Sequence, residues 1–120
     1  MAFLSDICWN VFLNWTEYLE TQIEYLAEID DAEEEQMFRA RWAALNENAD
    51  KDAGLGKLRF RRWGEEADGD ILDLTGLTNK EVLNALAEYA GHLADGALGD
   101  HIYVEGLKEE GNFWVISWGS

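Results

Sequence analysis

The chain has no proline, a single cysteine and no long apolar run. Cys8 alone cannot form an internal disulfide or a zinc site of the paired-cysteine type, and we expect it to be a small side chain buried on a helix face. No apolar stretch reaches the roughly 18 residues that a membrane span needs, and no basic region precedes an apolar segment at the N-terminus. We therefore expect a cytosolic protein. To the absence of proline we attach no function.

Basic residues are scarce, above all at the start of the chain. The 120 residues carry 25 acids against 9 Lys and Arg, a formal net charge of −16. Residues 1–50 have a net charge of −10 and contain only two bases, Arg39 and Arg41, whereas residues 51–120 have a net charge of −6. Such a field repels nucleic acid and anionic membranes. We expect basic proteins as partners, and no direct binding of nucleic acid or membrane.

Apolar and aromatic residues are plentiful in spite of this charge. Hydrophobic residues make up 48% of the chain, which includes six Trp, four Tyr and five Phe. Disordered acidic chains are poor in these residues, and 120 residues suffice for one buried core. The composition therefore predicts a single folded acidic domain over residues 1–120.

Two helices are predicted for the first half, residues 1–50. Over residues 4–29, apolar residues recur at helical spacing and Ser5 is a candidate N-cap. A second helix is predicted to run to about Asn48. Its candidate N-cap is Asp30-Asp31, followed by acids where the helix dipole favours them. The pattern leaves open whether the two helices are one.

The second half, residues 57–120, changes to the pattern ββαββ. Alternating segments over residues 57–63 and 70–74 predict one β-hairpin, and those over residues 101–107 and 112–118 predict another. Between them Thr78 and Glu81 have the spacing of a capping box, and a third helix is expected to end at the glycines 96 and 99. The prediction is an α+β domain in which two N-terminal helices and a third cover an antiparallel sheet of about four strands.

No group of residues has the spacing of a catalytic or metal site. His92 and His101 are isolated from each other and from Cys8, and no nucleophile, base and orienting group occur together. We therefore expect no enzyme, no cofactor and no metal. The one basic cluster comprises Lys57, Arg59, Arg61 and Arg62, and we expect it to pair with neighbouring acids such as Glu65 and Glu66.

The most informative pattern is a row of six acids at steps of three or four residues. Such steps place side chains on one side of a helix, about 5 to 6 Å apart. This separation is close to that of successive phosphates, so the lysines and arginines of a nucleic-acid channel can dock on the row. A turn at Asp30-Asp31 would leave only the first four aligned. The six are Glu17, Glu20, Glu24, Glu28, Asp31 and Glu35.

An ordinary solvated face is the competing interpretation, because amphipathic helices place charged residues outward. Residues 1–38 contain no Lys or Arg, however, so attractive pairs are absent and like charges cost roughly a few tenths of a kcal/mol each. A basic partner would offset that cost. Exposed aromatic residues beside the row would add desolvated anchors, and the candidates are Trp9, Tyr18 and Tyr25.

In size, acidity and its mixture of helices and hairpins, the chain resembles the small phage-encoded inhibitors called anti-CRISPR proteins, several of which block nucleic-acid binding by presenting carboxylates. It is also similar to the acidic immunity proteins that neutralise bacterial nuclease toxins. Both resemblances rest on composition and on the acidic stretch from Glu17 to Glu35, and they transfer no functional residue. The first implies a DNA mimic acting in the cytoplasm of a bacterial host cell.

The leading hypothesis is an inhibitor that binds a basic nucleic-acid-binding protein or nucleoprotein complex through a carboxylate-rich helix face. An immunity protein against a nuclease is the first alternative, and we place it second because an extended row suits a channel better than a compact enzyme cleft. The other alternative is an assembly module, a homodimer joined through the Trp-rich first helix or the last strand, whose acidity serves solubility.

Overall fold

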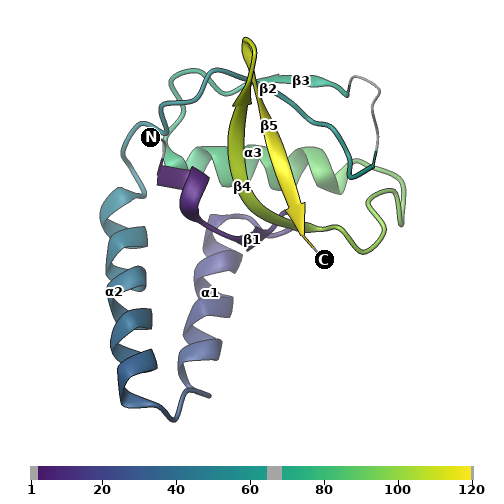
Figure 1. The fold of residues 1–120 in the computed structure, drawn as a ribbon. Helices are drawn as coiled ribbons and strands as arrows, with labels where there is room; N and C mark the ends of the chain where they lie inside the picture. Colours follow the sequence, from purple (N-terminus) through teal and green to yellow (C-terminus); the bar gives the residue numbers. More distant parts are fainter. Residues whose placement is uncertain (1–2, 65–68, 120) are drawn as a thin grey trace.

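A computed structural model describes residues 3–64 and 69–119 of the chain (Figure 1). It has an α+β fold in which a helical hairpin projects from a sheet that α3 covers on one face. The extents of 45 × 30 × 21 Å reflect this projection. The elements are the 3-10 turn η1 (Phe3–Asp6), β1 (Trp9–Asn10), α1 (Trp15–Leu26), α2 (Ala32–Asn48), β2 (Lys57–Arg59), β3 (Ile71–Asp73), α3 (Asn79–Gly91), β4 (Tyr103–Glu110) and β5 (Phe113–Gly119).

The prediction of a helix starting near Leu4 is wrong, because α1 begins at Trp15. The residues before it form η1 and β1, and β1 pairs antiparallel with β4 at the edge of the sheet. Trp9 and Val11 are both buried, which is the alternation of a strand. Asn14 and Glu17 then form a capping box that starts the helix, the role expected of Ser5. Cys8 is exposed, so its predicted burial on a helix face is also wrong.

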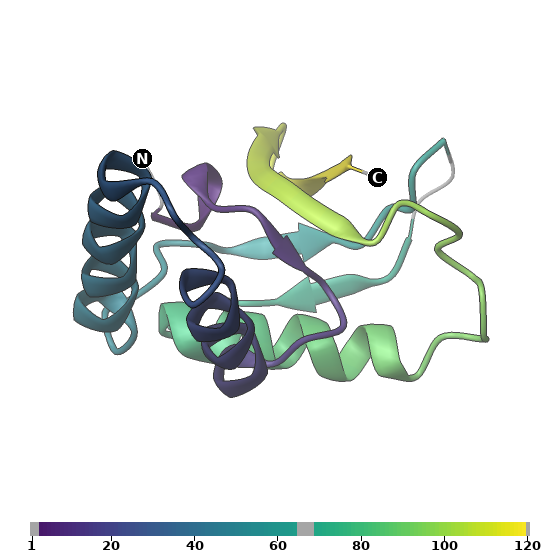
Figure 2. The same ribbon diagram turned by 90° about the horizontal axis from the view of Figure 1, so that it is seen from below.

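The turn between α1 and α2 answers the question that the sequence left open. Asp31 accepts hydrogen bonds from the amides of Glu33 and Glu34 at 2.9 and 3.0 Å, and α2 begins at Ala32. The predicted second helix is confirmed to its end at Asn48. α1 and α2 lie side by side and antiparallel, and their joining turn is the point farthest from the sheet (Figure 1). Figure 2 looks along both helices from the side of this turn.

The sheet has five strands rather than about four, in the order β1-β4-β5-β2-β3. Both predicted hairpins are confirmed as antiparallel pairs, β2 with β3 and β4 with β5. The prediction of a wholly antiparallel sheet is wrong, because β2 and β5 are parallel neighbours. Local alternation indicates strands and hairpins but not which hairpins lie next to each other, so neither this pairing nor the addition of β1 could be read from it.

The core lies between the sheet, α3 and the end of the helical hairpin nearest the sheet. It includes Leu58 of β2, Leu83 and Leu86 of α3, and Val104 of β4. The capping box of Thr78 and Glu81 starts α3 as predicted, but the helix ends at Gly91 with His92 as its C-cap, before the glycines expected to end it. No helix in the described part of the chain is long and apolar enough to cross a membrane.

One glycine is required where η1 packs on the sheet. Gly106 lies at an irregularity in the β4–β5 pairing and has a φ of +155°, and an added Cβ would stand 2.7 Å from the carbonyl oxygen of Ser5. A side chain there would separate η1 from β4. The packing of the N-terminal segment therefore depends on the absence of a side chain at this position.

The basic cluster is engaged within the sheet. Arg61 forms an ion pair with Glu110 at 3.2 Å, and the guanidinium of Arg59 lies 4.5 Å from the centre of the Phe113 ring. The expected partners Glu65 and Glu66 lie outside the described residues. Arg61 therefore pairs with an acid of β4 that is distant in sequence, which sequence spacing alone does not indicate.

Candidate functional site

The helical hairpin formed by α1 and α2, which we call the acidic hairpin (residues 15–48), has a packed base and a solvated distal half. At its base, Trp15, Tyr18 and Leu45 belong to the core, and the Trp15 amide donates to Oδ1 of Asn84 on α3 at 2.8 Å. Between Leu19 and Met37, a stretch described throughout, no residue is buried. The hairpin therefore presents about two turns of each helix to solvent on all sides except their mutual contact.

Three predicted acids lie on α1 and all three are exposed. At 100° per residue Glu17, Glu20 and Glu24 point to the same side, opposite the face that packs on the core. Glu17 serves the capping box, because its Oε1 accepts from the Asn14 amide at 3.1 Å. Glu20 and Glu24 have no such internal role, and they remain the acids of α1 that a partner can reach.

The six acids do not line one helix face, because the chain turns at Asp31; this is the alternative in which only the first four were expected to stay aligned. Glu28 is exposed but follows the end of α1 at Leu26. Asp31 is the N-cap of α2, and Glu35 forms an ion pair with Arg39 at 2.9 Å. Asp31 and Glu35 were candidates for partner contacts, but in the folded chain both already have structural partners. The row is thus interrupted by the turn, and Glu20, Glu24 and Glu28 remain as its solvent-facing part.

The turn gathers acids that the row of six did not include. Residues 24–35, which we call the acidic tip, also contain Asp30, Glu33 and Glu34 and have no base. Asp30 and Glu33 are exposed side chains, whereas Glu34 accepts a hydrogen bond from the Tyr25 hydroxyl at 2.9 Å. The run of acids at residues 30–35 signalled this cluster, but only the turn brings it beside the end of α1.

The two bases of the acidic hairpin, Arg39 and Arg41, do not neutralise this surface. Arg39 is paired with Glu35, and Arg41 faces a hollow at the base of the hairpin beside Tyr18 and Cys8. Glu20, Glu24 and Glu28 form no ion pair with any residue in the described ranges 3–64 and 69–119. The negative charge of these three residues is therefore left to solvent.

Two of the three predicted aromatic anchors are not available to a partner. Trp9 is 2% exposed and Tyr18 is 3% exposed, because β1 and the base of α1 both face the core. Burial also raises the pKa of Tyr18 to about 12. Of the three candidates, Tyr25 alone is exposed as predicted, and it packs on Phe38 of α2 with 5.6 Å between the ring centres.

Exposed aliphatic side chains also lie on the hairpin, a feature that the search for aromatic anchors missed. Ile23 on α1 is 53% exposed and Met37 on α2 is 69% exposed. By helical angle, Ile23 and Tyr25 lie on opposite flanks of the side that carries Glu20 and Glu24. A partner that covers this side can bury apolar surface while it neutralises carboxylates.

The described residues contain no group of three or more His, Cys, Asp or Glu arranged to hold a metal ion. Comparison with known proteins found no matching family model, no matching curated protein and no matching solved structure. What the hairpin can do is therefore argued from its geometry and charge alone.

Proposed function

We propose that the protein is an inhibitor that binds a basic nucleic-acid-binding protein or nucleoprotein complex through the acidic hairpin, in the manner of the anti-CRISPR proteins that mimic nucleic acid. The hairpin would enter or cover a groove that normally holds a nucleic-acid backbone. Lysines and arginines of that groove would contact Glu20, Glu24 and Glu28 in place of phosphates, so the protein would compete with nucleic acid for one site.

The observation that carries this proposal is the unpaired charge of these three glutamates on a projecting element. An arginine or lysine 4 Å from a carboxylate gains about 1 kcal/mol in water and more where the interface excludes water. Neighbouring carboxylates that repel one another in the free protein would be relieved by the same cations. Long-range attraction would also speed the encounter and make it sensitive to salt.

Two exposed apolar side chains on the hairpin, Ile23 and Met37, would add to binding. In a complex, burying these two side chains and Tyr25 would contribute affinity that salt does not screen. We therefore expect the interface to combine a charge-dependent association rate with an apolar contribution to residence time.

An immunity protein for a nuclease toxin is a second candidate with the same chemistry. It differs in its target, a compact basic cleft rather than an extended channel. The hairpin projects from the rest of the protein (Figure 1), and its acids lie along α1 and around the turn, an arrangement suited to insertion into a channel. We therefore keep the nuclease as an alternative outcome of the same experiment.

The routes to a homodimer considered from the sequence meet physical obstacles. Trp9 is used in the protein's own core, and β5 is an interior strand between β4 and β2, so its edges are already hydrogen-bonded. Self-association through the hairpin would bring two acidic surfaces together. Its net negative charge opposes such contact between identical copies.

The experiment is capture from a bacterial lysate with the immobilised protein and two charge-reversed variants. In Glu20→Lys with Glu24→Lys, the α1 acids are reversed while the capping residues stay intact. In the matched control, Asp95→Lys with Asp100→Lys, the same number of charges is reversed in the loop after α3, on the opposite side of the molecule from the hairpin in both views (Figures 1 and 2). Circular dichroism verifies that both variants are folded.

We expect the wild type and the control to retain the same basic nucleic-acid-binding protein at about 0.15 M salt, and the hairpin variant to lose it. Retention should fall sharply at about 0.5 M salt, where the screening length is about 4 Å. Equal retention by the two variants would remove the hairpin acids from the function. Retention of a nuclease and of no other nucleic-acid-binding protein would favour the immunity alternative.

A further inference from the structure

A second candidate site is a hollow at the base of the acidic hairpin, where α1 and α2 meet the N-terminal segment. It has a volume of about 430 Å³, and small-molecule sites in proteins measure roughly 300–1,000 Å³. Its walls come from η1 and the residues after it, from the first two turns of α1 and from the second half of α2. The apolar residues of the lining are Phe3, Ile7, Ala44 and Leu45.

One guanidinium supplies the charge of this hollow. Arg41 of α2 lines it and is exposed, so a ligand can reach the group. The other polar residues of the lining are neutral, and they are Cys8, Tyr18 and Gln22. Burial raises the pKa of the Tyr18 hydroxyl, as burial and then Glu105 raise that of the Cys8 thiol, and the charge of Arg41 acts against both shifts. The positive charge therefore reaches the α1 wall and the N-terminal wall of the hollow alike.

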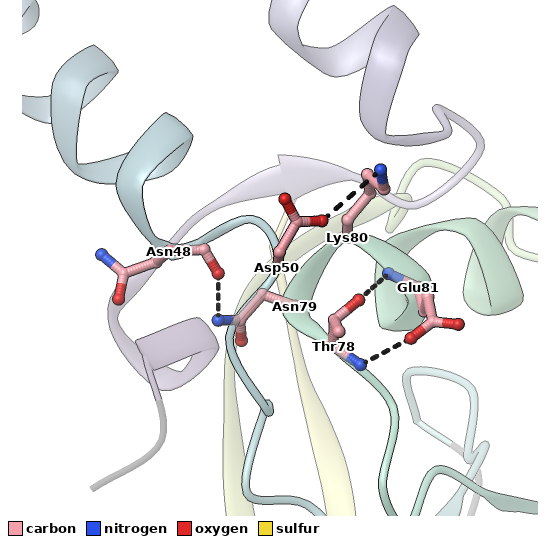
Figure 3. A network of polar contacts seen from close by, with 6 residues as sticks. All are labelled: Asn48, Asp50, Thr78, Asn79, Lys80 and Glu81. Atoms are coloured by element: carbon pink, nitrogen blue, oxygen red, sulfur yellow. Dashed lines mark hydrogen bonds and ion pairs between the residues drawn. The ribbon is translucent and has the colours of Figure 1, made fainter.

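Arg41 differs from the other bases on or next to the helices, because it has no acidic partner among the described residues. Those other bases are Arg39, which pairs with Glu35 at 2.9 Å, Lys51, with Glu47 at 3.9 Å, and Lys80, with Asp50 at 3.6 Å, the last pair drawn in Figure 3. The residues three and four positions from Arg41 on α2 are apolar, so the helix supplies it with no carboxylate. They are Met37, Phe38, Ala44 and Leu45.

Two neutral polar groups beside Arg41 are also available to a ligand. Gln22 is half-buried, and its side-chain amide forms no hydrogen bond within the described part of the chain, so it can still donate. The Tyr18 hydroxyl donates to the Cys8 carbonyl at 3.5 Å, which is long for a bond between two oxygens. The hollow thus offers donors and one positive charge on an apolar lining.

We propose that this hollow binds a carboxylate with an apolar tail, such as a medium-chain aliphatic acid. The guanidinium of Arg41 can hold both carboxylate oxygens through paired hydrogen bonds, while the Gln22 amide donates to one of them. The half-buried side chains of Phe3 and Ile7 would cover the tail. One guanidinium balances the single charge of a carboxylate, whereas a phosphate monoester carries about −1.5 to −2 and would leave negative charge uncompensated in this acidic protein.

The inference does not rest on the proposed function. Gln22 lies two positions from both Glu20 and Glu24 on α1, which is about 200° around the helix. The hollow and these acids therefore face different sides of the hairpin, and a ligand in the hollow would leave the acids accessible.

The test is a titration of the ¹⁵N-labelled protein with octanoate, with its neutral analogue octanamide, with acetate, which lacks the tail, and with octyl phosphate. We expect saturable shifts of the Gln22 side-chain amide and the Arg41 Nε–H with octanoate, and affinities lower by about tenfold or more for octanamide and acetate. Tighter binding of octyl phosphate than of octanoate would contradict the assignment to a carboxylate.

The test variant is Arg41→Gln, which removes the charge at an exposed position and should leave the fold intact. The matched control is Arg39→Gln, the same change two positions earlier on α2, where the arginine is paired with Glu35. Octanoate affinity should fall by about tenfold or more in the test variant and stay unchanged in the control. A second variant, Ala44→Leu, keeps Arg41 and fills part of the hollow, so it should also weaken octanoate, with circular dichroism to verify its fold.

The hairpin variant Glu20→Lys with Glu24→Lys should bind octanoate normally, so a failure of the proposed function would leave this result unaffected. Absent saturation at Gln22 and Arg41, equal affinity for octanamide or acetate, or unchanged octanoate affinity in Arg41→Gln would overturn the proposal.

Discussion

Replacing Asp31 with alanine distinguishes a hairpin from one continuous helix by the sign of its effect on stability. In the structure Asp31 caps α2 through two backbone amides at 2.9 and 3.0 Å. Removing such a cap costs about 1 kcal/mol, and losing the charge at the positive end of the helix dipole adds a few tenths. We expect Asp31→Ala to lower the unfolding free energy by about 1–1.5 kcal/mol and the melting temperature by about 4 °C.

A continuous helix through residue 31 would respond in the opposite direction. Alanine exceeds aspartate in helix propensity by roughly 0.6 kcal/mol, and removing Asp31 would relieve its repulsion by Glu28 and Glu35. The substitution would then stabilise the protein by about 1 kcal/mol. The two arrangements therefore differ by about 2 kcal/mol, well above the error of a careful denaturation experiment.

The assay is urea denaturation of the wild type, Asp31→Ala and Asp31→Asn, followed by circular dichroism. Asparagine keeps the acceptor oxygen, so Asp31→Asn should lose only the charge contribution, a few tenths of a kcal/mol. Hydrogen exchange of the Glu33 and Glu34 amides reports the cap locally, and should accelerate in Asp31→Ala alone. An Asp31→Ala variant as stable as the wild type, or more stable, would refute the hairpin turn.

Three further predictions concern the body of the protein. Gly106→Ala should lower the unfolding free energy by about 1–3 kcal/mol, as measured by urea denaturation. The reason is that the φ of +155° at Gly106 and the nearby Ser5 carbonyl exclude a side chain. A neutral effect would contradict the packing of η1 on β4. Stability should fall as pH rises from about 10 to 12, because burial raises the pKa of Tyr18 to about 12 while the same hydroxyl ionises near 10 in the unfolded chain. Tyr18→Phe should reduce that slope, and an unchanged slope would contradict the burial. Cys8 is exposed, so mass spectrometry should detect its adduct with iodoacetamide in the folded protein. The reaction should be slower than that of free cysteine, because partial burial and then the charge of Glu105 raise the pKa of the thiol. The absence of an adduct without denaturant would contradict the exposure.

Elements whose signals are local were predictable from the sequence. The cap of α2 at Asp31 follows from acids placed where the helix dipole favours them, and its end at Asn48 follows from the loss of apolar periodicity before the glycines 54 and 56. The start of α3 follows from the spacing of Thr78 and Glu81. Each of these signals lies within one helical turn, so no knowledge of distant residues was needed.

Elements decided by distant contacts were not predictable in this way. Residues 4–14 carry apolar side chains that suit a helix and, at Trp9 and Val11, also suit a strand. Pairing with β4 decides between them, because Trp9 lies opposite Val104 and the Val11 amide donates to the Ile102 carbonyl at 2.9 Å. These partners lie more than ninety positions along the chain. The parallel pairing of β2 with β5 is non-local in the same sense.

The candidate site was predictable in its charge but not in its outline. Helical spacing indicated that Glu20 and Glu24 face solvent, and they do. Asp31 caps α2 and Glu35 pairs with Arg39, and both roles compete with contact to another protein. Spacing alone could not show which role each residue has. Trp9 and Tyr18 were assigned to the surface beside the acidic row because residues 4–29 were taken for one amphipathic helix, whereas β1 and the base of α1 bury them.

The central claim is that the acidic hairpin occupies the place of a nucleic-acid backbone on its partner. The direct measurement is fluorescence anisotropy of labelled nucleic acid bound to the purified captured partner, during titration with the protein. We predict that the wild type and the control variant Asp95→Lys with Asp100→Lys release the nucleic acid stoichiometrically. The hairpin variant Glu20→Lys with Glu24→Lys should not release it. A ternary complex in which the partner holds both the protein and its nucleic acid would contradict the claim.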